Sequence, residues 1–111
     1  MKEVLFEVQG SAAEPYDVIF VKKSETELSA YCSCPAGKNG QYCKHRFSIL
    51  DGLTKNIVSD NYDQVKLVQS WLLGTDVEVA LIQMRGLESR AAQIKKELSA
   101  SKKNVAKAMR D

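Results

Sequence analysis

The chain has 111 residues, of which 44% are hydrophobic and 27% are charged, and its formal net charge is +2. This length predicts one small domain with room for an appendage, and the composition is ordinary for a globular protein. The longest aliphatic run, Val79 to Ile82, falls far short of the roughly 20 apolar residues of a membrane span. The N-terminus carries acids inside its apolar stretch, so we expect neither a secretory signal nor a membrane partner.

Three short stretches near the N-terminus have the composition and the alternation of β-strands. They comprise residues 3–9, 17–22 and 26–32. Apolar residues recur with a period of two or are densely β-branched, and the links between the stretches are short. This pattern predicts an antiparallel β-meander whose last strand ends at Cys32.

All three cysteines and the only histidine lie within fourteen residues, from Cys32 to His45. They form two tight pairs, Cys32-Ser33-Cys34 and Cys43-Lys44-His45, separated by a linker of eight residues. Three thiols and one imidazole are the ligand set of a closed, tetrahedral structural zinc site. We therefore predict that Cys32, Cys34, Cys43 and His45 hold one structural Zn²⁺ ion.

The local sequence explains how the four ligands converge. Residues i and i+2 of an extended chain point to the same side, so both thiols of the first pair can face one ion. Residues 35–40 have the composition of a loop, and apolar residues after Cys43 have helical spacing, with Gly52 as a candidate helix end. The second pair would then lie at a helix N-terminus, where the helix dipole stabilises thiolates.

Other readings of the four residues are weaker. Three buried hydrophobes with a surface histidine would not require this spacing, and a Cys–His nucleophile would not need two further cysteines. An open catalytic zinc is disfavoured because all four ligand positions are filled. An odd number of cysteines at metal-ligand spacing indicates a reducing compartment, so we expect an intracellular protein of the cytoplasm, nucleoid or nucleus.

A helical extension is predicted after a polar connector at residues 54–61. Ser59 or Asp60 is expected to cap a helix at about 62–73, in which Trp71 is a core residue, and Gly74 is a natural stop. Thr75 and Glu78 have the spacing of a capping box. A second helix is predicted at about 76–109, where mostly apolar residues recur at a and d heptad positions over roughly 50 Å.

The C-terminal helix carries the basic character of the chain. Residues 77–111 hold eight Lys/Arg and four Asp/Glu, whereas residues 1–58 are balanced at seven of each. A DNA-binding basic region followed by a zipper is rejected, because the bases share the heptads of the seam. We expect this helix to pack on a neighbouring helix, on a protein partner, or on a second copy as a homodimer through residues 77–109.

The pattern Cys-x-Cys-x8-Cys-x-His resembles the SWIM zinc finger family, with Pro35 after the second cysteine and a basic residue before His45. The resemblance covers roughly residues 3–53 and implies a ββα-type unit with zinc between the sheet end and a helix. SWIM domains occur in Mutator-type transposases, in proteins that accompany remodelling ATPases, and in recombination factors. The family therefore implies DNA binding and protein–protein interaction.

The predicted fold class is α+β: a small β-meander and short helix around structural zinc in residues 1–58, and a helical extension with a long coiled-coil-like helix in 59–111. Neither a phosphate loop nor a catalytic acid cluster is present in the sequence, so we expect no enzyme and no small-molecule substrate. DNA is a possible partner, with candidate phosphate contacts at Lys22, Lys23, Lys38, Lys44 and Arg46. The alternative is a protein–protein adaptor that binds no DNA and in which zinc only holds the fold.

Overall fold

A computed structural model describes residues 1–110. The chain divides into two compact units, Met1–Glu78 and Val79–Asp111. The first unit extends past residue 58, where the sequence places the end of the zinc module, and includes the first helix of the predicted extension.

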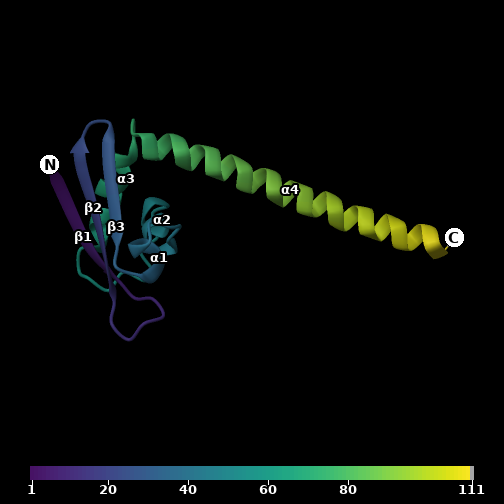
Figure 1. Cartoon of the computed structure of the whole chain (residues 1–111), viewed down its shortest axis with the longest axis horizontal. Helices are drawn as coiled ribbons and strands as arrows, with labels where there is room; N and C mark the ends of the chain where they lie inside the picture. Colours follow the sequence, from purple (N-terminus) through teal and green to yellow (C-terminus); the bar gives the residue numbers. More distant parts are fainter. Residues whose placement is uncertain (111) are drawn as a thin grey trace. The chain divides into compact units, whose positions relative to one another are not determined.

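The first unit is built on a three-stranded antiparallel sheet (Figure 1). Its strands are β1 (Lys2–Val8), β2 (Tyr16–Ser24) and β3 (Glu27–Cys32), in the order β1-β2-β3. The register shifts near the end of β2, between Lys22 and Ser24. The predicted β-meander is confirmed, with strand ends within two residues of the predicted ones.

One face of the sheet is buried and the other is not. The residues that are at most 6% exposed alternate along the strands, as a period of two requires, although Tyr16, Lys22 and Ala30 on the same face are only partly buried. The buried residues are Val4, Phe6, Val8, Val18, Phe20, Leu28 and Cys32. The rings of Phe6 and Phe20 pack edge to face with centroids 6.1 Å apart. Leu5 and Tyr31 lie on the opposite face and are about half exposed, at 47% and 54%.

Two short helices follow the sheet. The stretch predicted as a loop contains a single helical turn, α1 (Pro35–Lys38), because Pro35 fits the first helical position and Cys34 caps it. Helix α2 (Lys44–Leu50) begins directly after Cys43, as predicted. It ends at Leu50 with Asp51 as its C-cap, and the next residue, Gly52, has a φ of 86° in the left-handed region. The amides of Gly52 and Leu53 donate to the carbonyls of Ile49 and Ser48.

The polar connector after α2 returns to the sheet. Ile57 forms an antiparallel bridge with Val8, and the amide of Val58 donates to the carbonyl of Glu7 at 2.8 Å. The amide of Gln9 in turn donates to the carbonyl of Asn56 at 2.8 Å. These contacts place residues 55–57 beside the end of β1 and close to the start of α2.

The next helix covers the buried face of the sheet. It starts as a 3₁₀ turn, η1 (Tyr62–Gln64), and continues as α3 (Val65–Leu72), of which Val65, Val68 and Trp71 are buried. The prediction that Ser59 or Asp60 caps it is wrong, since Asn61 is the N-cap residue. The Ser59 side chain accepts from the Glu7 amide. The core position of Trp71 is confirmed.

The last helix, α4 (Asp76–Arg110), runs from the first unit through the second. Its start confirms the predicted cap at Thr75, since the amide of Glu78 donates to Thr75 Oγ1 at 3.3 Å. The Glu78 carboxylate accepts from the Gly74 amide and not from the Thr75 amide that a full capping box uses, because the Thr75 amide donates to the Leu72 carbonyl. Gly74 has a φ of 80° and separates α3 from α4. Among residues 1–110, none of the helices combines the length and apolar character that a bilayer crossing requires.

Candidate metal centre

The first ligand pair lies where β3 ends. Cys32 is the last residue of β3, opposite Val18 of β2, and its thiol faces the core side of the sheet. Ser33 then ties this end to β2, because its amide donates to the Asp17 carbonyl and its hydroxyl accepts from the Asp17 amide, at 3.0 and 2.9 Å. The residue between the two cysteines is therefore fixed at both of its polar groups.

Cys34 begins α1 and is held by it. Its Sγ accepts from the Gly37 amide at 3.2 Å, so the thiol is the side-chain cap of this short helix. Gly37 packs directly on the other ligand: a Cβ at this position would lie 2.5 Å from the Cys32 carbonyl oxygen and 2.8 Å from the Cys32 Cβ. Only a glycine lets α1 approach the strand end this closely.

The second ligand pair lies at the start of α2. Cys43 is the N-cap residue and His45 lies in the first turn, which confirms the predicted placement. Arg46 joins this turn to the rest of the unit, since its guanidinium donates to the carbonyl of Ala30 in β3 at 3.2 Å and to that of Gln41 at 2.6 Å. Arg46 thus connects β3 to the linker between the two ligand pairs, close to the ligands themselves.

The four ligand atoms form a cluster of the size that zinc requires. They all lie within 4.8 Å of one another. Nδ1 of His45 is 3.5 Å from Cys43 Sγ and 3.7 Å from Cys32 Sγ, and the sulfurs of Cys34 and Cys43 are 3.4 Å apart. Tetrahedral zinc with bonds of about 2.3 Å to sulfur and 2.0–2.1 Å to nitrogen separates its ligands by roughly 3.5–3.8 Å. The donor set therefore fits a closed zinc site.

The imidazole of His45 has one nitrogen toward the thiols and one toward the protein. Its Nε2 is buried and has no hydrogen-bond partner among residues 1–110, and its ring packs against Tyr16 with centroids 5.0 Å apart. Gly10 closes this side, because a Cβ there would stand 2.9 Å from Nε2 and 2.5 Å from the Tyr16 ring. Steric packing thus fixes the ring so that Nδ1 is the ligand atom.

The thiols have unequal proton affinities before a metal arrives. Burial raises the pKa of Cys32 to about 12, and the thiols of Cys34 and Cys43 contribute to the rise. Burial also acts to raise the pKa of Cys43, but hydrogen bonds from the Arg46 amide, the other two thiols and His45 lower it to about 6. A bound Zn²⁺ would supply the positive charge that favours the thiolate form of its cysteine ligands.

The residues predicted to contact nucleic acid fall into two groups. Lys23, Lys38 and Lys44 are exposed. Lys22 Nζ donates to the carbonyls of Trp71 and Glu25 at 2.7 and 2.9 Å, and Arg46 is held by the two carbonyls named above.

Sequence reasoning missed several residues around the site. These are Gly10 and Gly37, which pack against ligand residues, and Asn56, which the connector brings next to α2. Gly10 meets His45 and Asn56 meets Gln9 only in the folded chain, because these pairs lie far apart in the sequence. Gly37 meets Cys32 only because residues 35–38 form a helical turn that composition did not reveal. No local pattern could have identified them.

A comparison with protein families identifies this arrangement. Residues 16–47 match the model of the SWIM zinc finger family, and this range contains β2, β3, α1 and all four ligands. Neither the curated proteins nor the solved structures contain a match to the chain. Residues 16–47 therefore match a SWIM zinc finger, a binding module rather than a catalytic domain, and within them Cys32, Cys34, Cys43 and His45 are arranged to hold one structural zinc ion.

Proposed function

We propose that this protein is a non-enzymatic zinc-binding module that contacts DNA through the surface around Lys44, and that α4 mediates assembly. One observation carries the DNA contact: Lys44 lines two hollows, both of which include the ligand His45. Lys44 is exposed, and its amine has no hydrogen bond or ion pair among residues 1–110. Zinc would make this surface rigid, and the lysine would supply its charge.

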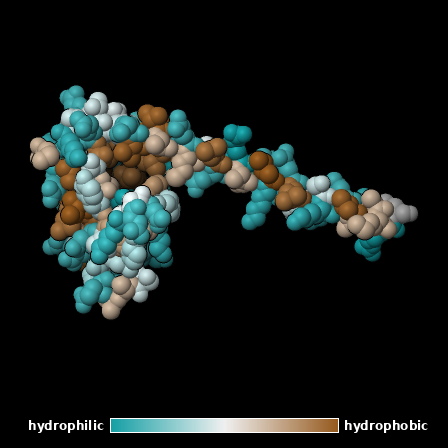
Figure 2. Space-filling model, viewed as in Figure 1, coloured by the Kyte–Doolittle hydropathy of each residue, from teal (hydrophilic) through white to brown (hydrophobic). Residues whose placement is uncertain are grey.

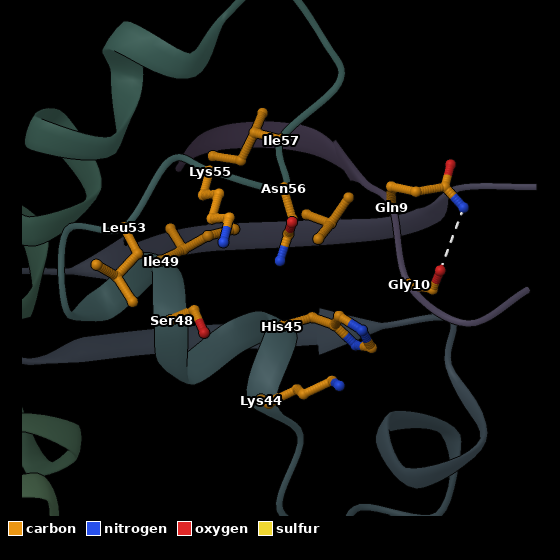
Figure 3. A pocket seen from close by; sticks show the side chains of 11 residues that line it. Gln9, Gly10, Lys44, His45, Ser48, Ile49, Leu53, Lys55, Asn56 and Ile57 are labelled. Atoms are coloured by element: carbon orange, nitrogen blue, oxygen red, sulfur yellow. Dashed lines mark hydrogen bonds between the residues drawn. The ribbon is translucent and has the colours of Figure 1, made fainter.

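The first hollow has a volume of about 480 Å³ and combines cationic and neutral donors (Figure 3). Lys44, His45 and Ser48 come from α2, and Lys55 and Asn56 come from the connector that faces it. Among the described residues that line this hollow, none is acidic. Two lysines with serine and amide donors are groups that commonly contact phosphate oxygens.

The second hollow, of about 390 Å³, lies over the zinc ligands and has an aromatic side. It is lined by Tyr16, Tyr42 and Pro35, together with Lys44 and three of the ligand residues. Tyr42 is 64% exposed, and its ring packs against Phe47 with centroids 4.5 Å apart, so it is held in place. An exposed, supported aromatic ring beside a lysine can stack on an unpaired base.

Lys38, Lys44 and Lys55 are the phosphate contacts in this proposal. Lys22 and Arg46 are given a structural role instead, because their donors already bond to backbone carbonyls. A phosphate would have to replace those hydrogen bonds, which connect β2 to α3 and α2 to β3.

The test is fluorescence anisotropy of labelled single-stranded and duplex DNA at two salt concentrations. We expect affinity to fall with salt, and Lys44→Glu and Lys55→Glu each to weaken binding about tenfold while lowering the salt slope by about 1. Lys66→Glu is the matched control, since Lys66 is exposed on α3 and lines neither hollow. Absence of binding at low salt, or an equal effect of all three variants, would contradict the proposal.

A protein partner is the second candidate, and the apolar lining of the first hollow favours it. Val8, Ile49, Leu53 and Ile57 are among its lining residues, and Leu53 is 57% exposed. A mostly apolar lining with a few polar groups is the common form of a ligand-binding site. Binding of the chain to an extended apolar peptide, abolished by Leu53→Asp and insensitive to salt, would support this candidate over DNA.

A further inference from the structure

The second unit consists of one helix with an exposed apolar stripe. Leu87, Ile94, Leu98 and Val105 of α4 are between 52% and 60% exposed and recur at a and d positions of a heptad. Figure 2 shows hydrophobic side chains recurring along α4 between hydrophilic ones. A single helix cannot bury such a stripe by itself, so its exposure indicates a missing partner.

We propose that the partner is α4 of a second copy, packed antiparallel so that Ala91 of each helix faces Ile94 of the other. This inference rests on the assembly role proposed for α4 and adds the occupant, its direction and its register. It does not depend on DNA binding. The pairing is centred between residues 92 and 93, close to the middle of Asp76–Arg110, so it overlaps nearly the whole of both helices.

Packing favours this register because small and large residues face each other. Where Ala91 meets Ile94 of the second copy, Leu98 meets Leu87 and Ser101 meets Met84. In an antiparallel pair, each a residue packs against a d residue of the other helix, so the gap beside one alanine or serine is filled by a larger side chain. These three central layers each occur twice by symmetry, which gives six.

The charges beside the seam are complementary in the same register. Glu88 of one helix lies opposite Lys95 of the second copy, at e positions, and Arg90 lies opposite Glu97, at g positions. Symmetry doubles both pairs, which gives four attractive contacts and no like-charge contact between these residues. The sequence of one helix is therefore complementary to itself when it is reversed.

Antiparallel registers shifted by one heptad lose this complementarity. A shift toward the N-terminus places Glu88 opposite Glu88 and Arg90 opposite Arg90. A shift toward the C-terminus places Lys95 opposite Lys95 and Glu97 opposite Glu97. Like charges at these positions oppose association, so the charge pattern selects one of the three registers.

A parallel pair is also disfavoured. It would stack Ala91 on Ala91 and Ser101 on Ser101, which leaves gaps in the seam. It would also place Arg90 opposite Lys95 of the other helix twice, with attraction only between Glu97 and Lys102. The packing and the charges therefore favour the same direction.

The test uses sedimentation equilibrium of the full, zinc-loaded chain without DNA. We expect the native chain to dimerise, and Lys95→Glu or Glu88→Lys each to weaken dimerisation on the order of tenfold, because two attractive pairs become repulsive. An equimolar mixture of the two variants should restore the dimer, since each repelling position then meets the opposite charge. Lys96→Glu is the matched control, because it makes the same charge change on the outer face of the helix.

Each alternative gives a different result. A parallel dimer would be tightened by Lys95→Glu, which brings a glutamate opposite Arg90. In an antiparallel dimer shifted by one heptad, at least one of the two variants would not weaken dimerisation, because Glu88 or Lys95 then faces its own copy and the pair is repulsive before and after the change. A native chain that stays monomeric at high micromolar concentration would also overturn the inference. None of these outcomes bears on the Lys44 anisotropy measurement, so failure of DNA binding and failure of this pairing are distinguishable.

Discussion

Gly37 provides the sharpest test of how the fold builds the zinc site. In Gly37→Ala, the new Cβ would lie 2.5 Å from the carbonyl oxygen of Cys32 and 2.8 Å from the Cys32 Cβ. The nearest group is backbone at the end of β3, so it cannot rotate away as a flexible side chain would. Relief therefore requires α1 and the strand end to separate by roughly 1 Å, which moves Cys34 away from Cys32.

The free-energy cost of Gly37→Ala follows from the two interactions that it disturbs. Overpacking at a close approach costs about 1–3 kcal/mol, and weakening the hydrogen bond from the Gly37 amide to Cys34 Sγ adds up to about 1 kcal/mol. Folding and metal binding are coupled in small zinc modules, so this energy is lost from zinc affinity. A loss of about 2 kcal/mol raises the zinc dissociation constant about 30-fold.

The assay is a competitive zinc titration against a chromophoric chelator, with circular dichroism to follow the fold. Gly86→Ala is the matched control, because it adds the same methyl group where nothing lies within 4 Å. That variant should leave zinc affinity unchanged and stabilise α4 by about 1 kcal/mol. A dissociation constant for Gly37→Ala within twofold of the native value would refute this reasoning.

Three further predictions follow from the core, the metal and the helix cap. Metal analysis should find one zinc per chain, and zinc affinity should fall as the pH is lowered from about 8 to 5, since protons compete for the thiolates and the imidazole; a pH-independent affinity would contradict this. Phe20→Ala should destabilise the fold by about 3–5 kcal/mol in urea denaturation because Phe20 is fully buried, whereas Leu5→Ala on the exposed face should cost under about 1 kcal/mol. Thr75→Ala should cost about 1–2 kcal/mol, because its hydroxyl accepts from the Glu78 amide and donates to the Leu72 carbonyl; Thr75→Ser should retain most of this, and equal losses in both variants would argue against the cap.

The connector after α2 has no distinctive sequence motif, yet it contributes residues to the proposed DNA-contacting surface. Residues 54–61 read as a polar link, yet Ile57 bridges to Val8 and brings Lys55 and Asn56 across from Lys44. Lys55 therefore becomes part of the proposed DNA surface because its segment pairs with β1, and not because of its neighbours in the sequence. Charge clusters counted along the chain do not reveal such a surface.

The sequence by itself determined the ligands, the meander, the start of α2 and the two later helices. These features depend on spacing over a few residues: a period of two, a heptad repeat, a glycine stop or a capping pair. The turn at Pro35 and the cap at Asn61 were not predicted, because composition there fits both a loop and a helix start. A short sequence pattern predicts an element only where it is compatible with one type of secondary structure.

Only the tertiary structure decided which groups remain available for function. Lys22 and Arg46 resemble the other surface cations in the sequence, but the fold directs their donors to the carbonyls of Trp71 and Ala30. The fold likewise decides that Gly10 closes the pocket around His45. One physical reason applies to Lys22, Arg46 and Gly10. The role of each residue depends on which groups lie next to it after the sheet and helices pack, and those groups are far away in the sequence.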